Sequence, residues 1–195
     1  MSHPHRHAHP PAAVLFDRDG TLIHDVPYNG DPSLVEPVPG AREALDRLRR
    51  AGVPLGVVSN QSGIAKGLIS QEALSEVNAR VEELLGPFDV WAVCPHDEAD
   101  GCYCRKPAPG LVLWAARTLG VDPADCVVIG DIGRDVEAAR VAGARGILVP
   151  TPVTRHAEVA AACEVAADIG RAAEMALEGF RPGGGDEFAA IRAEG

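Results

Sequence analysis

Residues 12–17 read AAVLFD, an apolar run of strand length that closes on an aspartate. Four further runs of this kind follow along the chain: VPLGVVSN (53–60), DVWAVC (89–94), CVVIGD (126–131) and RGILVP (145–150). Their apolar residues are not interleaved with polar ones, which is typical of strands buried on both faces of a parallel sheet. We therefore expect these runs to form one parallel sheet.

Stretches with helical periodicity lie between the runs. Their apolar residues recur at spacings of three and four, over residues 40–52, 70–86, 109–120 and 134–144. A terminal helix or a helix pair is expected over residues 160–180. Because strands alternate with helices, the sequence predicts an α/β fold, a three-layer, doubly wound parallel sheet of Rossmann-like type with right-handed crossovers.

The length of 195 residues suits one α/β domain. We expect that domain to cover residues 12–180, with a disordered His- and Pro-rich tail at 1–11 and a flexible tail at 181–195. In the first tail, proline removes backbone donors and so excludes a regular element. The histidines of this tail are either incidental or handle a metal.

The composition of the chain limits its partners. The net charge is −10, which argues against a nucleic-acid-binding face, because such a face needs cations to neutralise phosphates. No apolar run approaches the roughly 18–20 residues of a membrane span, and the N-terminus lacks the apolar core of a secretory signal. We expect a cytosolic protein that binds neither nucleic acid nor membrane, although backbone N–H groups and local cations could hold a small phosphorylated ligand.

Polar residues close several of the apolar runs. In an open α/β sheet, the site lies beyond the carboxyl ends of the strands, so these residues are expected to meet. The first run continues into DRDGT (17–21) and the second into SNQSG (59–63). The fourth ends on Asp131, with Asp135 four residues on, and Lys106 precedes a helix. The sequence thus predicts a polar site at one edge of the sheet.

Acids dominate this predicted site. Three acids at one edge would repel one another unless a cation neutralised them, and oxygen ligands of this kind suit a Mg²⁺ ion that bridges to a phosphate. One carboxylate can then act as a nucleophile while another moves a proton. A single aspartate that closes a strand is more commonly a helix cap or a turn former. Polar groups in all four segments together, the ends of the first, second and fourth runs and the loop with Lys106, favour phosphate chemistry.

Four motifs carry a resemblance to a known family: FDRDGTL, VVSNQSG, RKP and VIGDIGRD. They resemble the motifs of the haloacid dehalogenase superfamily of aspartate-nucleophile phosphohydrolases, over about residues 12–150. The resemblance implies that Asp17 attacks phosphorus and becomes an aspartyl-phosphate. It also implies that Asp19 protonates the leaving oxygen and later activates the hydrolytic water.

The same resemblance implies which groups bind the phosphoryl group and the metal. Ser59 would donate a hydrogen bond to the phosphoryl group, and Lys106 would balance its charge. A catalytic Mg²⁺ would be held by the Asp17 carboxylate, the Asp19 backbone carbonyl and Asp131. Asp135 would either lie behind these ligands or act through water.

Cysteine and histidine side chains form a further cluster, with the spacing C-x-H-x₅-C-x-C over Cys94, His96, Cys102 and Cys104. Three thiolates and an imidazole are a closed tetrahedral set for Zn²⁺ and leave no position open for catalysis, so we interpret the zinc as structural. The alternative, unrelated core cysteines, conflicts with the polar character of the loop. Cys126 and Cys163 lie in apolar or Ala-rich stretches and are expected to be small buried hydrophobes.

The zinc loop running into RKP resembles a narrower group, the D-glycero-D-manno-heptose 1,7-bisphosphate 7-phosphatases and the histidinol-phosphate phosphatases. About 37 residues separate Thr21 from Ser59, too few for a large cap domain, so a small monomer with an open site is expected. The stretches SNQSGIAKG (59–67) and CRKPAPG (104–110) favour the heptose enzyme. The five-residue spacing inside the zinc loop also occurs in the histidinol enzyme, which stays an alternative.

The resemblance further implies where a small phosphorylated sugar would bind. The implied positions are Asp25, Val26, Pro27, Tyr28, Asn60, Gln61, Ser62 and Arg105. The Arg105 guanidinium could bind the far phosphate or a sugar hydroxyl, or instead form a surface ion pair with the acids of 97–100. Ile132 departs from the group, because heptose phosphatases can present a lysine there. A phosphosugar-binding module without catalysis is the alternative of another class.

Overall fold

Five parallel strands form one sheet in the order β3-β2-β1-β4-β5. The computed structural model describes residues 10–178, so the expected tails at 1–11 and 181–195 lie outside the described residues, apart from Pro10 and Pro11. All five runs are confirmed as strands, each one or two residues shorter than its run. The strands are β1 (Ala13–Phe16), β2 (Leu55–Asn60), β3 (Val90–Cys94), β4 (Cys126–Gly130) and β5 (Arg145–Leu148).

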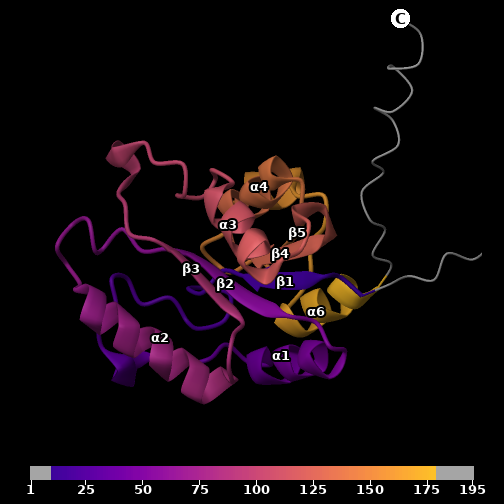
Figure 1. Ribbon diagram of the computed structural model, residues 1–195, viewed down its shortest axis with the longest axis horizontal. Coiled ribbons are helices and arrows are strands. Elements are labelled where there is room, and N and C mark those ends of the chain that lie inside the picture. Colours follow the sequence, from indigo (N-terminus) through magenta and orange to yellow (C-terminus); the bar gives the residue numbers. More distant parts are fainter. Residues whose placement is uncertain (1–9, 179–195) are drawn as a thin grey trace, which may run out of the picture.

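Helices cover both faces of this sheet, which confirms the three-layer prediction. The α-helices of the described residues are α1 (Ala41–Arg50), α2 (Gln71–Leu85), α3 (Gly110–Leu119), α4 (Gly133–Ala142), α5 (His156–Ala161) and α6 (Ile169–Leu177). Short 3₁₀ helices lie at Pro32–Leu34, Glu98–Asp100 and Pro123–Asp125. Figure 1 shows α3 and α4 above the sheet and α1 and α6 below it. No helix among residues 10–178 is long and apolar enough to cross a membrane.

The C-terminal helix pair differs from its predicted position. Helix α5 begins before residue 160, and residues 162–168 are not helical. This segment runs instead beside β5, where the Leu148 amide donates to Glu164 and the Ala166 amide donates to Leu148. Helix α6 begins only after it, where the Asp168 side chain accepts a hydrogen bond from the Arg171 amide. Backbone pairing with an edge strand therefore overrides the helical pattern here.

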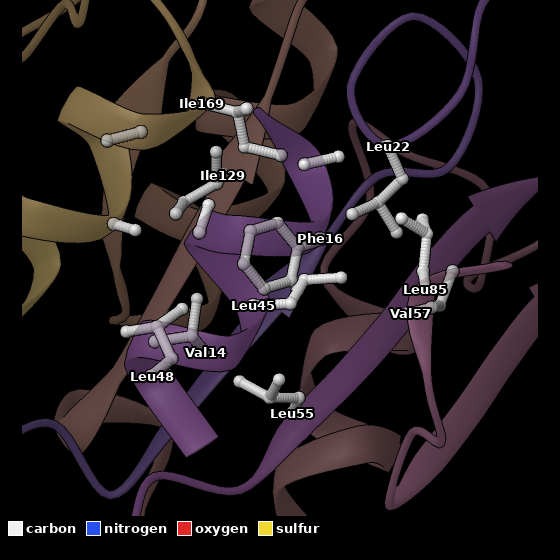
Figure 2. Packing of buried hydrophobic residues seen from close by; sticks show 14 of the residues in the cluster. Val14, Phe16, Leu22, Leu45, Leu48, Leu55, Val57, Leu85, Ile129 and Ile169 are labelled. Carbon is white, nitrogen blue, oxygen red and sulfur yellow. The ribbon is translucent and has the colours of Figure 1, made fainter. Parts of the chain in front are cut away.

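Alternating side chains of β1 divide the core between the two helical layers. Val14 and Phe16 face α1 and α6, where Figure 2 shows Phe16 among Leu45, Leu48 and Ile169. The intervening side chain, Leu15, belongs to the cluster under α3 and α4. A strand that is apolar at every position can satisfy both layers at once, which explains the uninterrupted run in the sequence.

Two cysteines outside the zinc motif behave differently. Cys126 is buried at the start of β4, as predicted. Cys163 is exposed, so the prediction that it is buried is wrong. The reason is the extended segment beside β5, which replaces the helix that would have buried this side chain.

The strand order fixes where a site can form. The chain builds outward from β1 in one direction through β2 and β3, and in the other through β4 and β5. The loops that leave the carboxyl ends of β1 and β4 therefore turn to opposite faces of the sheet, and a crevice opens between them.

Candidate active site

Three carboxylates converge at the carboxyl ends of β1 and β4; we call Asp17, Asp131 and Asp135 the acidic cluster. One oxygen from each lies within 4.8 Å of the others, and all three side chains are buried. The Asp17 amide donates to the Ile129 carbonyl at 2.9 Å, which ties the end of β1 to β4. The sheet itself thus brings acids from distant parts of the sequence together.

Two glycines make this approach possible. Gly20 has a φ of +85°, and a Cβ there would lie 2.4 Å from Asp131 Oδ2. A Cβ on Gly130 would lie 2.3 Å from the Cβ of Asp135. Any side chain at either position would displace an acid, so glycine is required on steric grounds.

Lys106 is the cation of the acidic cluster. Its ammonium lies 2.5 Å from Asp17 Oδ1 and 2.6 Å from Asp135 Oδ1, and it donates to the Val58 carbonyl at 2.7 Å. The Asn60 side chain fixes the lysine backbone, since its Nδ2 donates to the Lys106 carbonyl at 3.1 Å and its Oδ1 accepts from the Lys106 amide at 3.0 Å. Asn60, implied as a substrate residue, thus also positions the lysine.

Burial sets the protonation of these groups. It raises the pKa of Asp17 well above its ordinary value, against the opposing charge of Lys106. It raises the pKa of Asp131 to about 7, with a further contribution from the charge of Asp135. Burial lowers the pKa of Lys106, but the charges of Asp135 and Asp17 outweigh burial and raise it above its usual range. The acidic cluster holds more negative charge than one ammonium neutralises, and its oxygen ligands fit a hard divalent cation such as Mg²⁺.

Asp19 lies apart from the acidic cluster and is partly exposed, at 23% of its side chain. Its carboxylate accepts hydrogen bonds from the Arg18 guanidinium and, at 2.7 Å, from Gln61 Nε2. Gln61 Nε2 also donates to Ser59 Oγ at 2.8 Å. The predicted acid, the predicted phosphoryl-binding serine and a predicted substrate residue therefore form one hydrogen-bonded chain.

Arg18 was assigned no role from the sequence, yet it is among the largest fully buried side chains of the structure. Its Nη1 donates to Asn78 Oδ1 of α2 at 2.7 Å, while its other nitrogens face Asp19. The sequence did contain a signal, because an arginine directly after a fully buried strand has to find a partner for its charge.

A cavity of about 330 Å³ lies in front of the acidic cluster. Most of the implied substrate residues line it, namely Asp25, Val26, Pro27, Tyr28, Asn60, Gln61 and Ser62. Asn29, Gly63 and Val153 line it as well and were not predicted. Ile132 also lines it, at the position where the resemblance implied a lysine in the related phosphatases. Ser59 lies behind Gln61 and does not reach the cavity surface.

Arg105 departs from its expected position. It does not line the cavity, and its Nη1 donates to the His96 carbonyl at 3.3 Å. Within residues 10–178 it forms no ion pair with the acids of 97–100, and its buried Nε has no hydrogen-bond partner. Neither of the two roles weighed for Arg105 is seen in this conformation.

The four predicted zinc ligands come together at the end of β3; we call Cys94, His96, Cys102 and Cys104 the thiol cluster. The three Sγ atoms are 3.1 to 3.6 Å apart, and His96 Nδ1 lies 3.2 Å from Cys104 Sγ. A tetrahedral ion with Zn–S bonds of about 2.3 Å separates its sulfurs by about 3.8 Å, so these residues fit zinc closely. Burial, with the neighbouring thiols, raises the pKa of Cys94 to about 12.

Comparison with known families gives two matches along this chain. A family model of haloacid dehalogenase-like hydrolases matches residues 14–100, and a second HAD-hydrolase-like model matches residues 103–172. Together they include most of β1, all of β2 to β5, the acidic cluster and the thiol cluster apart from Cys102, which lies between the two matched ranges.

Named relatives and solved structures agree with these matches. The D-glycero-β-D-manno-heptose-1,7-bisphosphate 7-phosphatase of Pseudomonas aeruginosa is 37% identical over 143 residues, which cover 71% of this chain and 80% of that protein. The enzyme of the same name from Mesorhizobium japonicum is 39% identical over 70% of this chain and 69% of its own. The D,D-heptose 1,7-bisphosphate phosphatase of B. bronchiseptica, solved with magnesium and phosphate, superposes with a TM-score of 0.76 at 31% identity, over 85% of this chain and 98% of that chain.

Proposed function

Since this chain belongs to the haloacid dehalogenase-like hydrolases, we propose that it is a Mg²⁺-dependent phosphatase that removes the 7-phosphate of D-glycero-D-manno-heptose 1,7-bisphosphate. The observation that carries the proposal is the contact of Lys106 with Asp17 inside the acidic cluster, at the edge of the sheet where ligands bind. Two relatives that carry the heptose name match this chain over 80% and 88% of their own length.

The first half-reaction joins the substrate to Asp17. An Asp17 oxygen attacks phosphorus, the bond between phosphorus and the sugar oxygen breaks, and Asp19 gives its proton to that oxygen. Lys106, 2.5 Å from Asp17 Oδ1, orients the nucleophile and favours its ionised form against the effect of burial. The sugar leaves as an alcohol, and Asp17 carries the phosphoryl group.

The second half-reaction returns the enzyme to its starting state. Asp19, now ionised, takes a proton from a water molecule whose oxygen attacks the phosphorus on Asp17. The aspartyl oxygen is released with its electron pair, and inorganic phosphate departs. The residues that would hold Mg²⁺ are Asp17, Asp131 and the Asp19 carbonyl; the ion would supply charge neutralisation for the phosphoryl oxygens.

A bisphosphate brings a second phosphate that needs its own cation. Of the described residues, two cations line the cavity, Arg18 and Lys106, and both are paired with acids. Lys66 offers a further cation beside the cavity residue Tyr28. Its ammonium donates to the Tyr28 hydroxyl at 2.8 Å and lies 5.1 Å from the centroid of the Tyr28 ring. We propose that the retained phosphate binds at this lysine and tyrosine, both of which are exposed.

The remaining parts of the proposal concern the protein's state. We infer that the thiol cluster holds a structural Zn²⁺ and that the enzyme acts as a monomer in the cytoplasm. The histidinol-phosphate alternative is not favoured, because the relatives of this chain carry the heptose name. A module without catalysis is not favoured either, because Asp17, Asp19 and Lys106, to which the mechanism assigns roles, all line the cavity.

The test is phosphate release with Mg²⁺ from heptose 1,7-bisphosphate, fructose 1,6-bisphosphate and histidinol phosphate. We expect kcat/KM for the heptose to be at least about 100-fold higher, which is about 2.7 kcal/mol of differential transition-state binding. A higher kcat/KM for histidinol phosphate would overturn the substrate assignment but would remain consistent with the mechanism. Binding of all three substrates without release would overturn the proposed catalysis.

A further inference from the structure

The Arg18 guanidinium is a buried cation with few partners. The side chain is 2% exposed, and its hydrogen bonds within the described residues go to Asp19 and Asn78. A buried charge is costly unless it is paired, so this arginine and the Asp19 carboxylate depend on each other. Asp19 is the group to which the proposed function assigns proton transfer.

The two oxygens of Asp19 differ in what they accept. Oδ2 accepts from Arg18 Nη2 at 3.0 Å and from Gln61 Nε2 at 2.7 Å, with Arg18 Nε at 3.2 Å. Among residues 10–178, Oδ1 accepts from Arg18 Nε alone, at 3.1 Å. An oxygen whose lone pairs already receive strong donors has no room for a proton. Oδ1 is therefore the oxygen with lone-pair capacity left to exchange a proton with another group.

The arginine is held from outside the active-site loop. Its Nη1 donates at 2.7 Å to Asn78, which lies on α2. Helix α2 is anchored in the core by Val77 and Val81 on the same turns. The orientation of the guanidinium is thus set by a packed helix, and through it the plane of the Asp19 carboxylate is fixed.

We propose that Arg18 is a positioning residue that holds Asp19 so that Oδ1 delivers its proton to the leaving oxygen. The inference rests on the proposed function, which supplies the proton-transfer role of Asp19. As the new bond from Asp17 to phosphorus forms and the bond to the leaving oxygen breaks, the proton moves from Oδ1 to that oxygen. A lysine could supply the charge, but it lacks the planar array of donors that reaches both Asp19 and Asn78.

The test compares leaving groups. A sugar alkoxide needs a proton to leave, whereas p-nitrophenolate leaves without one. Since a positioned general acid contributes about 10²–10⁴-fold, Arg18→Met should lower kcat/KM on heptose 1,7-bisphosphate by about 100-fold. The loss on p-nitrophenyl phosphate should stay below about threefold. On the sugar phosphate, kcat/KM of Arg18→Lys should lie between those of Arg18→Met and the wild type. On p-nitrophenyl phosphate, the three proteins should differ little.

Asn78→Leu separates this role from a merely structural one. It removes the anchor on α2 without touching the reacting groups, and it should give a smaller loss, about fivefold to tenfold, with the same dependence on leaving group. Equal losses on both substrates in Arg18→Met and Asn78→Leu would overturn the inference and indicate support of the fold alone. If the wild type does not hydrolyse the heptose ester but hydrolyses fructose 1,6-bisphosphate, the proposed substrate is wrong. The inference about Arg18 is then tested by the same comparison of leaving groups with the fructose ester.

Discussion

The acidic cluster and the thiol cluster lie at the same edge of the sheet but differ in how they are built. The acidic cluster is buried, comes from the ends of β1 and β4, and offers three oxygens beside one ammonium. The thiol cluster comes from the end of β3 and the loop after it, and only Cys94 of its four residues is fully buried. Oxygen ligands at the acidic cluster would leave room around a Mg²⁺ ion for phosphate and water, whereas four N and S ligands would saturate Zn²⁺. The number and kind of ligands thus distinguish the proposed catalytic site from the proposed structural one.

The largest effect is expected from removing the nucleophile. Asp17→Asn should lower phosphate release by at least about 10³-fold, because an amide cannot form the phosphoryl-enzyme. The melting temperature should stay equal or rise, since burial opposes the charge of Asp17. Phosphate release and thermal melting measure both. Asp46→Asn, the same change at an exposed surface acid, is the matched control and should alter neither. Turnover retained in Asp17→Asn would exclude the covalent mechanism.

The thiol cluster should show the opposite behaviour. Cys102→Ser should lower the zinc content from about one equivalent per chain to near zero, measured by elemental analysis. Loss of a structural metal can cost about 4 kcal/mol, and each kcal/mol shifts the melting temperature of a domain of this size by about 2–4 °C, so we expect a fall of about 10 °C. Cys163→Ser changes an exposed thiol and serves as the control. An unchanged melting temperature in the metal-free variant would contradict a structural role.

The contrast between the clusters also explains what the sequence could predict. Strand ends in a parallel sheet share an edge, so Asp17 and Asp131 could be placed together from their positions in the sequence, and Lys106 from the resemblance of RKP to a family motif. The thiol cluster was predictable because its ligands are close in sequence. The sequence signalled that Arg18 needs a partner for its charge, but it did not reveal Asn78, 60 residues away, as that partner. Nor did it predict that Arg105 turns away from the cavity toward the His96 carbonyl, because side-chain direction depends on packing.

Residues 160–180 show the same limit at the level of the backbone. Alanine-rich composition favoured a helix, but hydrogen bonds to β5 drew residues 164–166 into an extended path. The local sequence pattern contains no information about an unpaired strand edge elsewhere in the fold.

Protonation of the acidic cluster gives a smaller effect, which depends on pH. The pKa of Asp131 is about 7 in the folded protein and about 4 in the unfolded chain, so the folded state binds more protons between these values. This acid therefore makes the protein less stable as pH rises from about 4 to 7 without Mg²⁺. Added Mg²⁺ binds the ionised form and should raise the melting temperature by a few degrees at pH 8 and by less at pH 5.5.

Asp131→Asn isolates this contribution from those of other groups. The variant keeps the shape of the side chain but cannot ionise, so the difference between its Mg²⁺-induced shifts at the two pH values should shrink. Thermal melting with and without Mg²⁺ at pH 5.5 and 8 makes the comparison. An equal Mg²⁺ shift at both values in the wild type would show that Asp131 does not control metal binding.

The smallest expected effect concerns the rim of the cavity, where Lys66 is proposed to bind the retained phosphate. Lys66→Met should raise KM for the 1,7-bisphosphate about tenfold and leave kcat within about twofold. The effect is limited because the lysine is exposed and Asp97, 3.9 Å away, already offsets part of its charge. Heptose 7-phosphate lacks the retained phosphate, so its KM should not change. Arg80→Met removes an exposed cation on α2 and controls for net charge. A rise in KM for both esters would show that Lys66 does not bind the retained phosphate. The next cation to substitute would then be Arg105, whose Nη1 now donates to the His96 carbonyl.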